Sequence, residues 1–253
     1  MLTQPLEKNA FLAQLPPPES ASLRTHLAPL EFSVGDSLHY CGDRVEDVIF
    51  PHSGLIALTV PLRENAGAGV TLIGHEGIVG GFAAAAGVPA SCDAEVHVAG
   101  AASRMSASAF RYALEQNASL RNLAARFDSA MLAHAQQTAL CNAAHPVEAR
   151  ICRYLLEVQD RCGGSKIPLT QATLGQLLSV RRTTVTLVAG RLEAAGVLQC
   201  RRGYMQIVDR YELERRACEC YGHLKQYTDK LFAPAEGGPI VPPVRAHSAR
   251  NVG

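Results

Sequence analysis

Residues 168–202 read PLTQATLGQLLSVRRTTVTLVAGRLEAAGVLQCRR, and this stretch decides the fold. Thr170 can cap a first helix, whose apolar residues recur at helical spacing: Leu174, Leu177 and Leu178. Residues 179–181 interrupt this pattern, and a second helix is predicted from about Arg182 until Gly196 ends it. Two short helices joined by a tight turn predict a helix-turn-helix, whose second helix enters the major groove of DNA.

The second helix of this motif has two faces of different character. One face is an apolar stripe of Val185, Val188 and Leu192. The opposite face carries the candidate base-reading residues: Arg182, Thr183, Thr186 and Leu187. An Arg can donate two hydrogen bonds to a guanine, and Thr or Leu can contact a thymine methyl group. An ordinary helical hairpin with a solvated polar face is the alternative interpretation.

A β-hairpin is predicted directly after the motif, over residues 197–208, and it favours DNA binding over that alternative. Arg201 and Arg202 lie at its tip, beside the turn residue Gly203. Two arginines on a hairpin tip are typical of a wing that contacts DNA phosphates. An amphipathic helix over residues 147–161 precedes the motif, and a third helix, roughly 210–224, is expected to close the small domain.

The charge of the chain divides between its two parts. The 253 residues carry a formal net charge of only +1. Residues 1–145 contain 8 Lys and Arg against 13 Asp and Glu, whereas residues 146–232 contain 14 against 9. An acidic N-terminal part and a basic C-terminal part are consistent with a sensor domain joined to a domain that contacts DNA phosphates.

The N-terminus shows no signal-peptide pattern, and no stretch reaches the roughly 20 apolar residues that span a bilayer. We therefore expect a cytoplasmic protein with no membrane partner, whose thiols stay reduced. Residues 233–253 hold four prolines and three glycines, and we expect this tail to be disordered.

The region before residue 146 is predicted to form a sensor. After a helical lead-in at residues 1–30, short apolar runs alternate with Gly, Pro and Asp turns over residues 31–115, which predicts a β-sandwich. Residues 116–145 lack Gly and Pro and predict one long helix. Residues 146–230 are predicted to form the DNA-binding domain.

We expect the long helix to pair with its copy in a homodimer, because a helix-turn-helix commonly binds two half-sites. Its apolar residues approach a heptad seam, and the predicted dimer contacts are Leu120, Leu123, Phe127, Met131 and His134. The alternative is a helix that packs on its own β-sandwich, which leaves a monomer.

The order of sandwich, long helix and winged helix-turn-helix resembles the Crp/Fnr superfamily of bacterial transcription regulators, over about residues 25–225. Residues 49–57, IFPHSGLIA, are similar to the family's FPxSGxV-type strand, and residues 73–80, IGHEGIVG, are similar to its glycine-rich turn. The resemblance implies an α+β fold with a jelly-roll, cyclic-nucleotide-binding-like sensor domain. It also implies a dimeric regulator that binds a palindromic operator in double-stranded DNA and contacts RNA polymerase.

The resemblance assigns roles to residues of the helix-turn-helix. Arg182 matches the family's first base-reading position, whereas Thr183 and Leu187 replace the common Glu and Arg, so we expect a different operator. Arg181 replaces a small capping residue and caps its helix poorly. The positions that match phosphate contacts in the family are Thr170, Gln171, Arg181 and Thr184.

The resemblance also implies an effector pocket, which would involve Gly74, Glu76, Gly77, Gly80 and Gln136. No arginine lies between Arg63 and Arg104 to hold a cyclic phosphate, and burying that charge without a cation is costly. We therefore predict that cyclic AMP binds weakly or not at all, that the effector is another signal, and that no cofactor is held. A cyclic-nucleotide-dependent activator remains an alternative.

The eight cysteines offer a further alternative, a thiol-based redox regulator that senses through Cys92, Cys141 or the pair Cys218 and Cys220. Cys218 and Cys220 are separated by one residue, so their thiols would point to different sides of a helix. We therefore expect no metal site there. The chain lacks the GxSxG, HExxH and phosphate-loop motifs. We therefore expect a protein that is not an enzyme.

Overall fold

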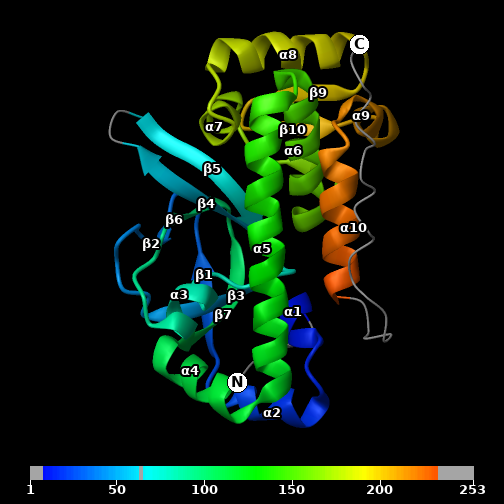
Figure 1. Cartoon of the computed structure of the whole chain (residues 1–253). Coiled ribbons are helices and arrows are strands. Elements are labelled where there is room, and N and C mark those ends of the chain that lie inside the picture. Colours follow the sequence, from blue (N-terminus) through cyan, green and yellow to red (C-terminus); the bar gives the residue numbers. More distant parts are fainter. Residues whose placement is uncertain (1–7, 63–64, 233–253) are drawn as a thin grey trace, which may run out of the picture.

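The computed structural model describes residues 8–62 and 65–232. The tail predicted to be disordered lies outside the described residues. In the described part, the chain forms a β-rich N-terminal domain, a long central helix and a C-terminal domain that contains the helix-turn-helix (Figure 1). The predicted fold class is therefore confirmed.

Two antiparallel sheets form the N-terminal domain. The first orders its strands β1 (Ala28–Phe32), β7 (Gly100–Ser106) and β3 (Asp47–Pro51). The second orders β2 (Ser37–His39), β6 (Asp93–Val98), β4 (Leu55–Leu62) and β5 (Asn65–Ile73). Apolar side chains from the two sheets share one core. Four helices accompany the sheets: α1 (Ala10–Ala13), α2 (Pro17–Arg24), α3 (Gly81–Ala86) and α4 (Ala107–Gln116).

The N-terminal lead-in inserts a side chain into this core. Phe11 is fully buried and packs edge-on against Phe127, with ring centroids 5.9 Å apart. The buried Asn9 side chain donates hydrogen bonds to the carbonyl oxygens of Pro51 and Gly77, at 2.8 and 2.9 Å. These bonds fix α1 against the glycine-rich turn. This position of α1 places the Phe11 ring beside Phe127, so aromatic rings fill the space between the sheets and the long helix.

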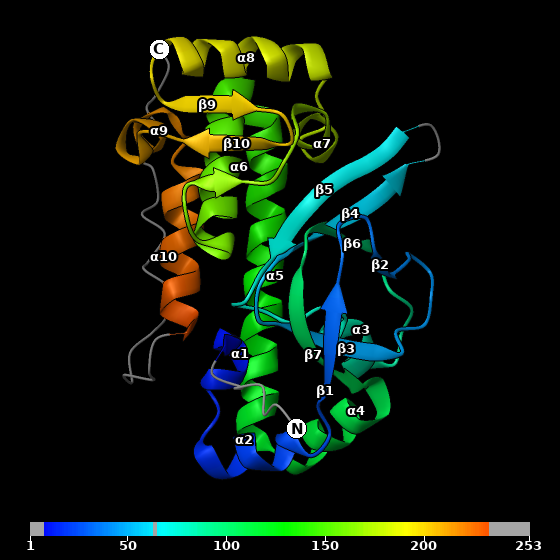
Figure 2. The same cartoon turned by 180° about the vertical axis from the view of Figure 1, so that it is seen from behind.

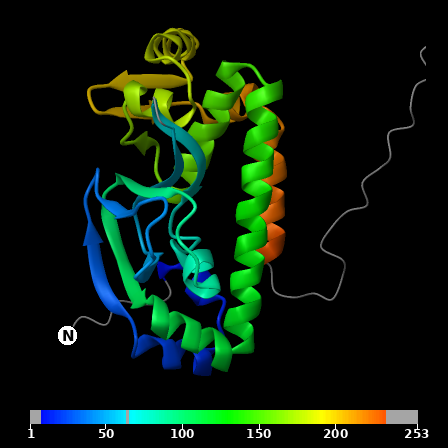
Figure 3. The same ribbon diagram turned by 60° about the vertical axis from the view of Figure 1, so that its left-hand side comes forward.

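The long helix α5 spans Ala118–Ala144 and packs along the N-terminal domain (Figure 3). Leu120, Leu123 and Phe127 are at most 6% exposed and belong to the core of the N-terminal domain. His134 is 4% exposed, and Met131 packs against the same core. The prediction of the dimer seam is therefore wrong for Leu120, Leu123, Phe127 and His134, because these side chains are buried within their own chain, and Met131 is half-buried there.

The C-terminal domain begins with α6 (Val147–Cys162) and continues through α7 (Gln171–Leu177) and α8 (Arg182–Ala194). Its small sheet orders β8 (Lys166–Ile167), β10 (Tyr204–Ile207) and β9 (Leu198–Arg201). The predicted third helix is two helices, α9 (Arg210–Arg216) and α10 (Cys220–Phe232). Ala217 adopts an extended backbone at the end of α9, which redirects α10 along α5 (Figure 1).

No helix in the described ranges combines the length and the apolar character that crossing a membrane requires.

Candidate nucleic-acid interface

The turn between α7 and α8 is fixed by three local features. Thr170 caps α7 as predicted, because its Oγ1 accepts a hydrogen bond from the Thr173 amide at 3.1 Å. Ser179 adopts a left-handed conformation with φ of 53°. A Cβ at Gly175 would lie 2.9 Å from the Val180 carbonyl oxygen, so only glycine lets the turn pass this close.

The faces of α8 separate as the sequence predicts. Val185, Val188 and Leu192 are buried, at 0, 4 and 0% exposure. The predicted base-reading residues all lie on the exposed side: Arg182, Thr183, Thr186 and Leu187. An apolar side chain that is 59% exposed, as Leu187 is, has no packing role within the chain. Their role in reading bases stays a prediction.

The start of α8 also meets α7. Thr186 Oγ1 donates a hydrogen bond to Gln171 Oε1 at 2.7 Å. This bond orients the Gln171 amide group toward the exposed face of α8. Arg181 occupies the N-cap of α8 and makes no capping hydrogen bond with its side chain, as expected for an arginine.

The predicted wing is the β9–β10 hairpin, whose tip lies on the same side of the domain as α7 and the start of α8 (Figure 2). Arg201 and Arg202 are exposed at this tip. In the part of the chain that the structure describes, no carboxylate pairs with these two arginines, with Arg181 or with Arg182, whereas Arg191 on the same helix reaches Glu148 at 3.8 Å. Four guanidinium groups without a carboxylate partner therefore lie on α8, the turn before it and the wing, together with the half-buried Thr184 and the exposed Thr170.

The glycine-rich turn is not a free effector site. Glu76 accepts hydrogen bonds from the Gly74 amide at 3.1 Å and from Arg161 Nε of α6 at 2.9 Å. A Cβ at Gly77 would lie 2.5 Å from the Phe127 ring, so this glycine admits the aromatic core. Gly80 adopts a φ of 80° at the start of α3. In this structure the partner of Glu76 is therefore a side chain of the C-terminal domain, and its role in an effector pocket stays a prediction.

Gln136 does not join this turn. It is exposed on α5, and its assignment to the effector pocket stays a prediction. The side chain that α5 directs inward at this level is His134.

A buried ionic network connects the long helix to α6. Glu157 is 5% exposed, and its carboxylate accepts hydrogen bonds from Arg153 Nη1 at 2.8 Å and from His134 Nε2 at 3.1 Å. Burial opposes ionisation of Glu157, but the charges of His134 and Arg153 prevail and lower its pKa to about 2. The carboxylate therefore stays ionised, and it joins α5 to the first helix of the C-terminal domain.

The cavities beside this network are small. One of about 210 Å³ lies between the glycine-rich turn, α6 and α10, and it is bordered by His75, Glu76 and Tyr221. A second, of about 20 Å³, lies between β5, α5 and α6. Pockets for drug-sized ligands measure about 300 Å³ or more, and a water molecule needs only about 10–15 Å³. Neither cavity has the size of a nucleotide pocket.

Sequence reasoning missed this network, although α6 carried a local signal for it. Arg153, Glu157 and Arg161 recur at i, i+4 spacing, and Arg153 and Glu157 lie on the buried side of the helix. A charged triplet on the inward side of an amphipathic helix indicates a buried ion pair. Its partners on other elements, Glu76 and His134, could not be identified from spacing within one helix.

Comparison with known proteins agrees with this architecture. A family described as the Crp-like helix-turn-helix domain matches residues 149–216. The solved structure of FixK2 from Bradyrhizobium japonicum is similar, with a TM-score of 0.67 and 15% identity over 76% of this chain and 98% of that one. A putative Crp/Fnr-family transcriptional regulator from Eubacterium rectale has a TM-score of 0.64 and 14% identity over 81% of this chain and 95% of that one.

A third similar structure is CLP from Xanthomonas campestris, described as a c-di-GMP responsive global regulator. It has a TM-score of 0.61 and 15% identity over 73% of this chain and 95% of that one. No curated protein matches this chain in sequence. The chain therefore has the fold of the Crp/Fnr transcription regulators, and residues 149–216 are its Crp-like helix-turn-helix domain.

Proposed function

We propose that the protein is a transcription regulator that binds a palindromic operator as a homodimer and acts in the cytoplasm, with RNA polymerase as a partner. The observation that carries this proposal is the exposed face of α8. Arg182, Thr183 and Leu187 face outward there, between unpaired arginines of the turn and of the wing. DNA recognition requires contacts to base edges, which carry specificity, and contacts to phosphates, which position the protein. The exposed side chains of α8 can supply the first kind, and the flanking arginines can supply the second.

The outer face of α5 is the proposed dimer contact. It lies opposite the buried face and follows alternating three- and four-residue spacing, the pattern of a coiled-coil seam. Its exposed residues are Ala125, Ser129, Leu132, Gln136, Ala139 and Ala143. Leu132 and the adjacent Leu140 are 61 and 56% exposed. Small residues permit close helix approach, and two leucines supply apolar area that a second copy would bury.

The proposed signal is not cyclic AMP. The Glu76 carboxylate of the glycine-rich turn pairs with Arg161, and aromatic rings fill the adjacent core. The Glu76–Arg161 pair supports a direct route from the N-terminal domain to α6. A signal that displaces this turn would reorient the DNA-binding domain without passing through the dimer helix.

Replacing Arg182 with Ala is expected to weaken operator binding by about 1–3 kcal/mol at one base pair and to relax specificity there, because the guanine loses a two-bond donor. Competition binding with operators changed one base pair at a time would measure this effect. Arg191→Ala is the matched control, because Arg191 lies on the same helix but pairs with Glu148. An unchanged base preference in Arg182→Ala would show that another face of α8 reads DNA.

Replacing Arg201 or Arg202 with Ala should act differently. Each loss of a phosphate contact should weaken binding to all sequences alike and reduce the salt slope by about 0.9 per phosphate. Affinities measured over a series of salt concentrations would give that slope for specific and random duplexes. A wing variant that changed base preference but not the slope would contradict a phosphate role.

A further inference from the structure

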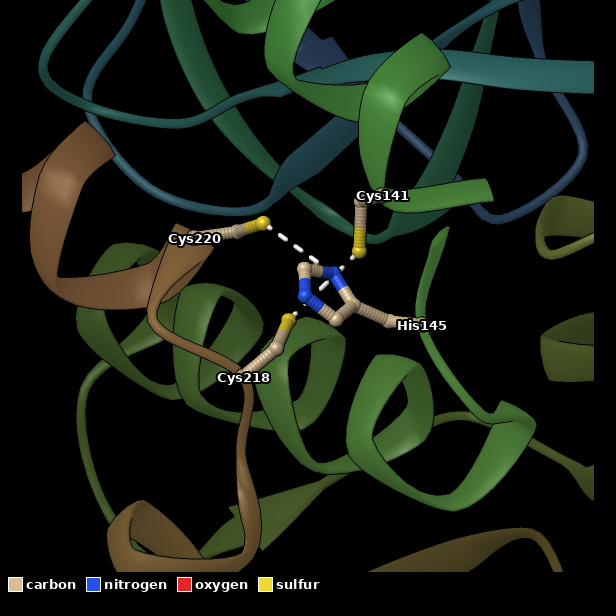
Figure 4. Close-up of side chains that lie close together, drawn as sticks. All are labelled: Cys141, His145, Cys218 and Cys220. Atoms are coloured by element: carbon tan, nitrogen blue, oxygen red, sulfur yellow. Dashed lines mark hydrogen bonds between the residues drawn. The ribbon is translucent and has the colours of Figure 1, made fainter. Parts of the chain in front are cut away.

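Four potential metal ligands converge where the long helix meets the C-terminal domain. Cys141 lies in the last turn of α5 and His145 at its C-cap, whereas Cys218 lies between α9 and α10, and Cys220 begins α10 (Figure 4). Their three sulfur atoms and a ring nitrogen of His145 all lie within 4.8 Å of one another. The expectation that Cys218 and Cys220 point to different sides of one helix is wrong, because Cys218 lies before α10 and both thiols belong to the same cluster.

We propose that these four side chains bind one Zn²⁺ ion in a tetrahedral site. The Sγ atoms of Cys141 and Cys218 are 3.5 Å apart, and Cys220 Sγ is 3.5 Å from His145 Nδ1. Zinc bonds of about 2.3 Å to sulfur and 2.0–2.1 Å to nitrogen give tetrahedral edges of about 3.8 and 3.6 Å. These two distances therefore lie within a few tenths of an ångström of tetrahedral edges, and all the other ligand-to-ligand distances are below 4.8 Å.

The surroundings of the site orient its ligands. His145 Nε2 donates a hydrogen bond to Glu219 Oε1 at 3.2 Å, which leaves Nδ1 free to bind a metal. A carboxylate behind a histidine is the usual support of a zinc ligand. Gln137 Nε2 donates to Cys220 Sγ at 2.9 Å, a contact that stabilises a thiolate. These two groups support a site in which the histidine is neutral and the sulfur carries charge.

A buried cation without a carboxylate partner lies in the same domain. Arg150 is 8% exposed and donates to the Leu178 carbonyl oxygen at 2.6 Å, but no carboxylate of the described residues pairs with it, and its Nε has no partner there. Zn²⁺ bound to three thiolates and a neutral imidazole carries one negative charge, which would balance this buried cation.

The compactness of the cluster selects among metal centres. An iron–sulfur cluster contains several iron atoms, so its protein ligands lie farther apart than the ligands of a single ion. The four ligand atoms here lie within 4.8 Å of one another, which leaves room for one ion only. Three cysteines and one histidine around a single ion are a common donor set of structural zinc. A closed set without a free position suits a structural site rather than a catalytic one.

The position of the site gives it a mechanical consequence. His145 lies between α5 and α6, the junction from which the C-terminal domain extends, and the ion would tie this junction to α10. Metal binding would thus fix the angle between the long helix and the DNA-binding domain. This effect on DNA rests on the proposed function, whereas the metal site itself does not.

The test begins with the metal content of the full chain, purified under reducing conditions and dialysed with Zn²⁺. One zinc per chain is expected, and the double variant Cys218→Ala, Cys220→Ala should retain less than a tenth of it. Cys92→Ala is the matched control, because Cys92 is a half-buried thiol outside the cluster, and it should retain one zinc. Equal zinc in the original chain and the double variant would overturn the proposal, as would an original chain that binds no zinc.

A spectroscopic measurement on the unaltered chain keeps the proposal testable if the double variant fails to fold. Co²⁺ should replace zinc and give the strong visible absorption of tetrahedral cobalt, with thiolate charge-transfer bands. Glu219→Gln should weaken Co²⁺ binding about 10- to 100-fold, whereas Glu115→Gln on α4, far along the chain, should not. A weak octahedral spectrum, or equal affinity in both variants, would contradict the assigned ligands and their support.

Discussion

Replacing Glu157 with Gln is expected to lower the free energy of unfolding by about 3–5 kcal/mol, the usual cost of breaking a buried ion pair from one side. The substitution leaves the Arg153 guanidinium, which is 2% exposed, without its carboxylate. Glutamine keeps one side-chain oxygen, so only one of the hydrogen bonds from Arg153 and His134 can be retained. Urea unfolding of the full chain near pH 7 would measure the change.

The matched control is Asp229→Asn on α10. Asp229 pairs with Lys225 at 3.2 Å, but both side chains are exposed, and such pairs contribute less than about 1 kcal/mol. Similar losses in both variants would show that the buried network does not stabilise the fold.

The same network predicts the acid behaviour of the protein. The pKa of Glu157 falls from its ordinary 4.5 to about 2 on folding. A lowered carboxyl pKa contributes stability that is complete above pH 4.5 and is lost as the pH falls toward 2. Stability curves from pH 5 to 2 should therefore fall more steeply for the original chain than for Glu157→Gln. Parallel curves would contradict the assigned ion pair.

Replacing both Leu132 and Leu140 with Glu is expected to give a monomer and to weaken binding to a palindromic operator by about 100-fold or more. Four like charges would face one another across the proposed seam, and the second half-site would no longer bind within the same complex. Analytical ultracentrifugation and binding to full and half operators would measure both effects.

The matched control replaces two exposed apolar residues away from α5, Val34 and Tyr112, with Glu. This control should remain a dimer with unchanged affinity. A dimer that persisted in the Leu132→Glu, Leu140→Glu variant would place the interface on another surface and leave the outer face of α5 without this role.

The helix-turn-helix could be predicted because its signals are local. The leucines of α7, the cap at Thr170, the close approach at Gly175 and the stripe of α8 lie within one short stretch, and each decides one feature of the motif. The wing follows from the arginine-rich turn in the same way. Local backbone preferences and tertiary packing agree here, so the sequence is informative.

The orientation of α5 could not be predicted because both of its faces have heptad-like spacing. One face carries Leu120, Leu123 and Phe127, and the other carries Leu132 among smaller residues. Periodicity shows that a helix has two contact faces but not which partner takes each. The N-terminal domain covers the face with the larger side chains, because burying them removes more apolar surface from water.

The charged and thiol clusters depend on contacts between distant segments. Glu76 meets Arg161, and Cys141 meets Cys218 across 77 positions. The sequence held one usable sign of the second cluster, since Cys141 and His145 stand four residues apart on one helix face. The break at Ala217, which brings Cys218 and Cys220 to that face, depends on how α10 packs against α5.

Selection of bound sequences from a random duplex pool tests the central claim, that the face of α8 reads a palindromic operator in a dimer that cyclic AMP does not control. The zinc-loaded full chain would be used with and without cyclic AMP. We expect one palindromic motif, recovered equally in both conditions, with half-sites about one helical turn apart. Recovery of a motif only with cyclic AMP, or enrichment of no motif at all, would contradict this account.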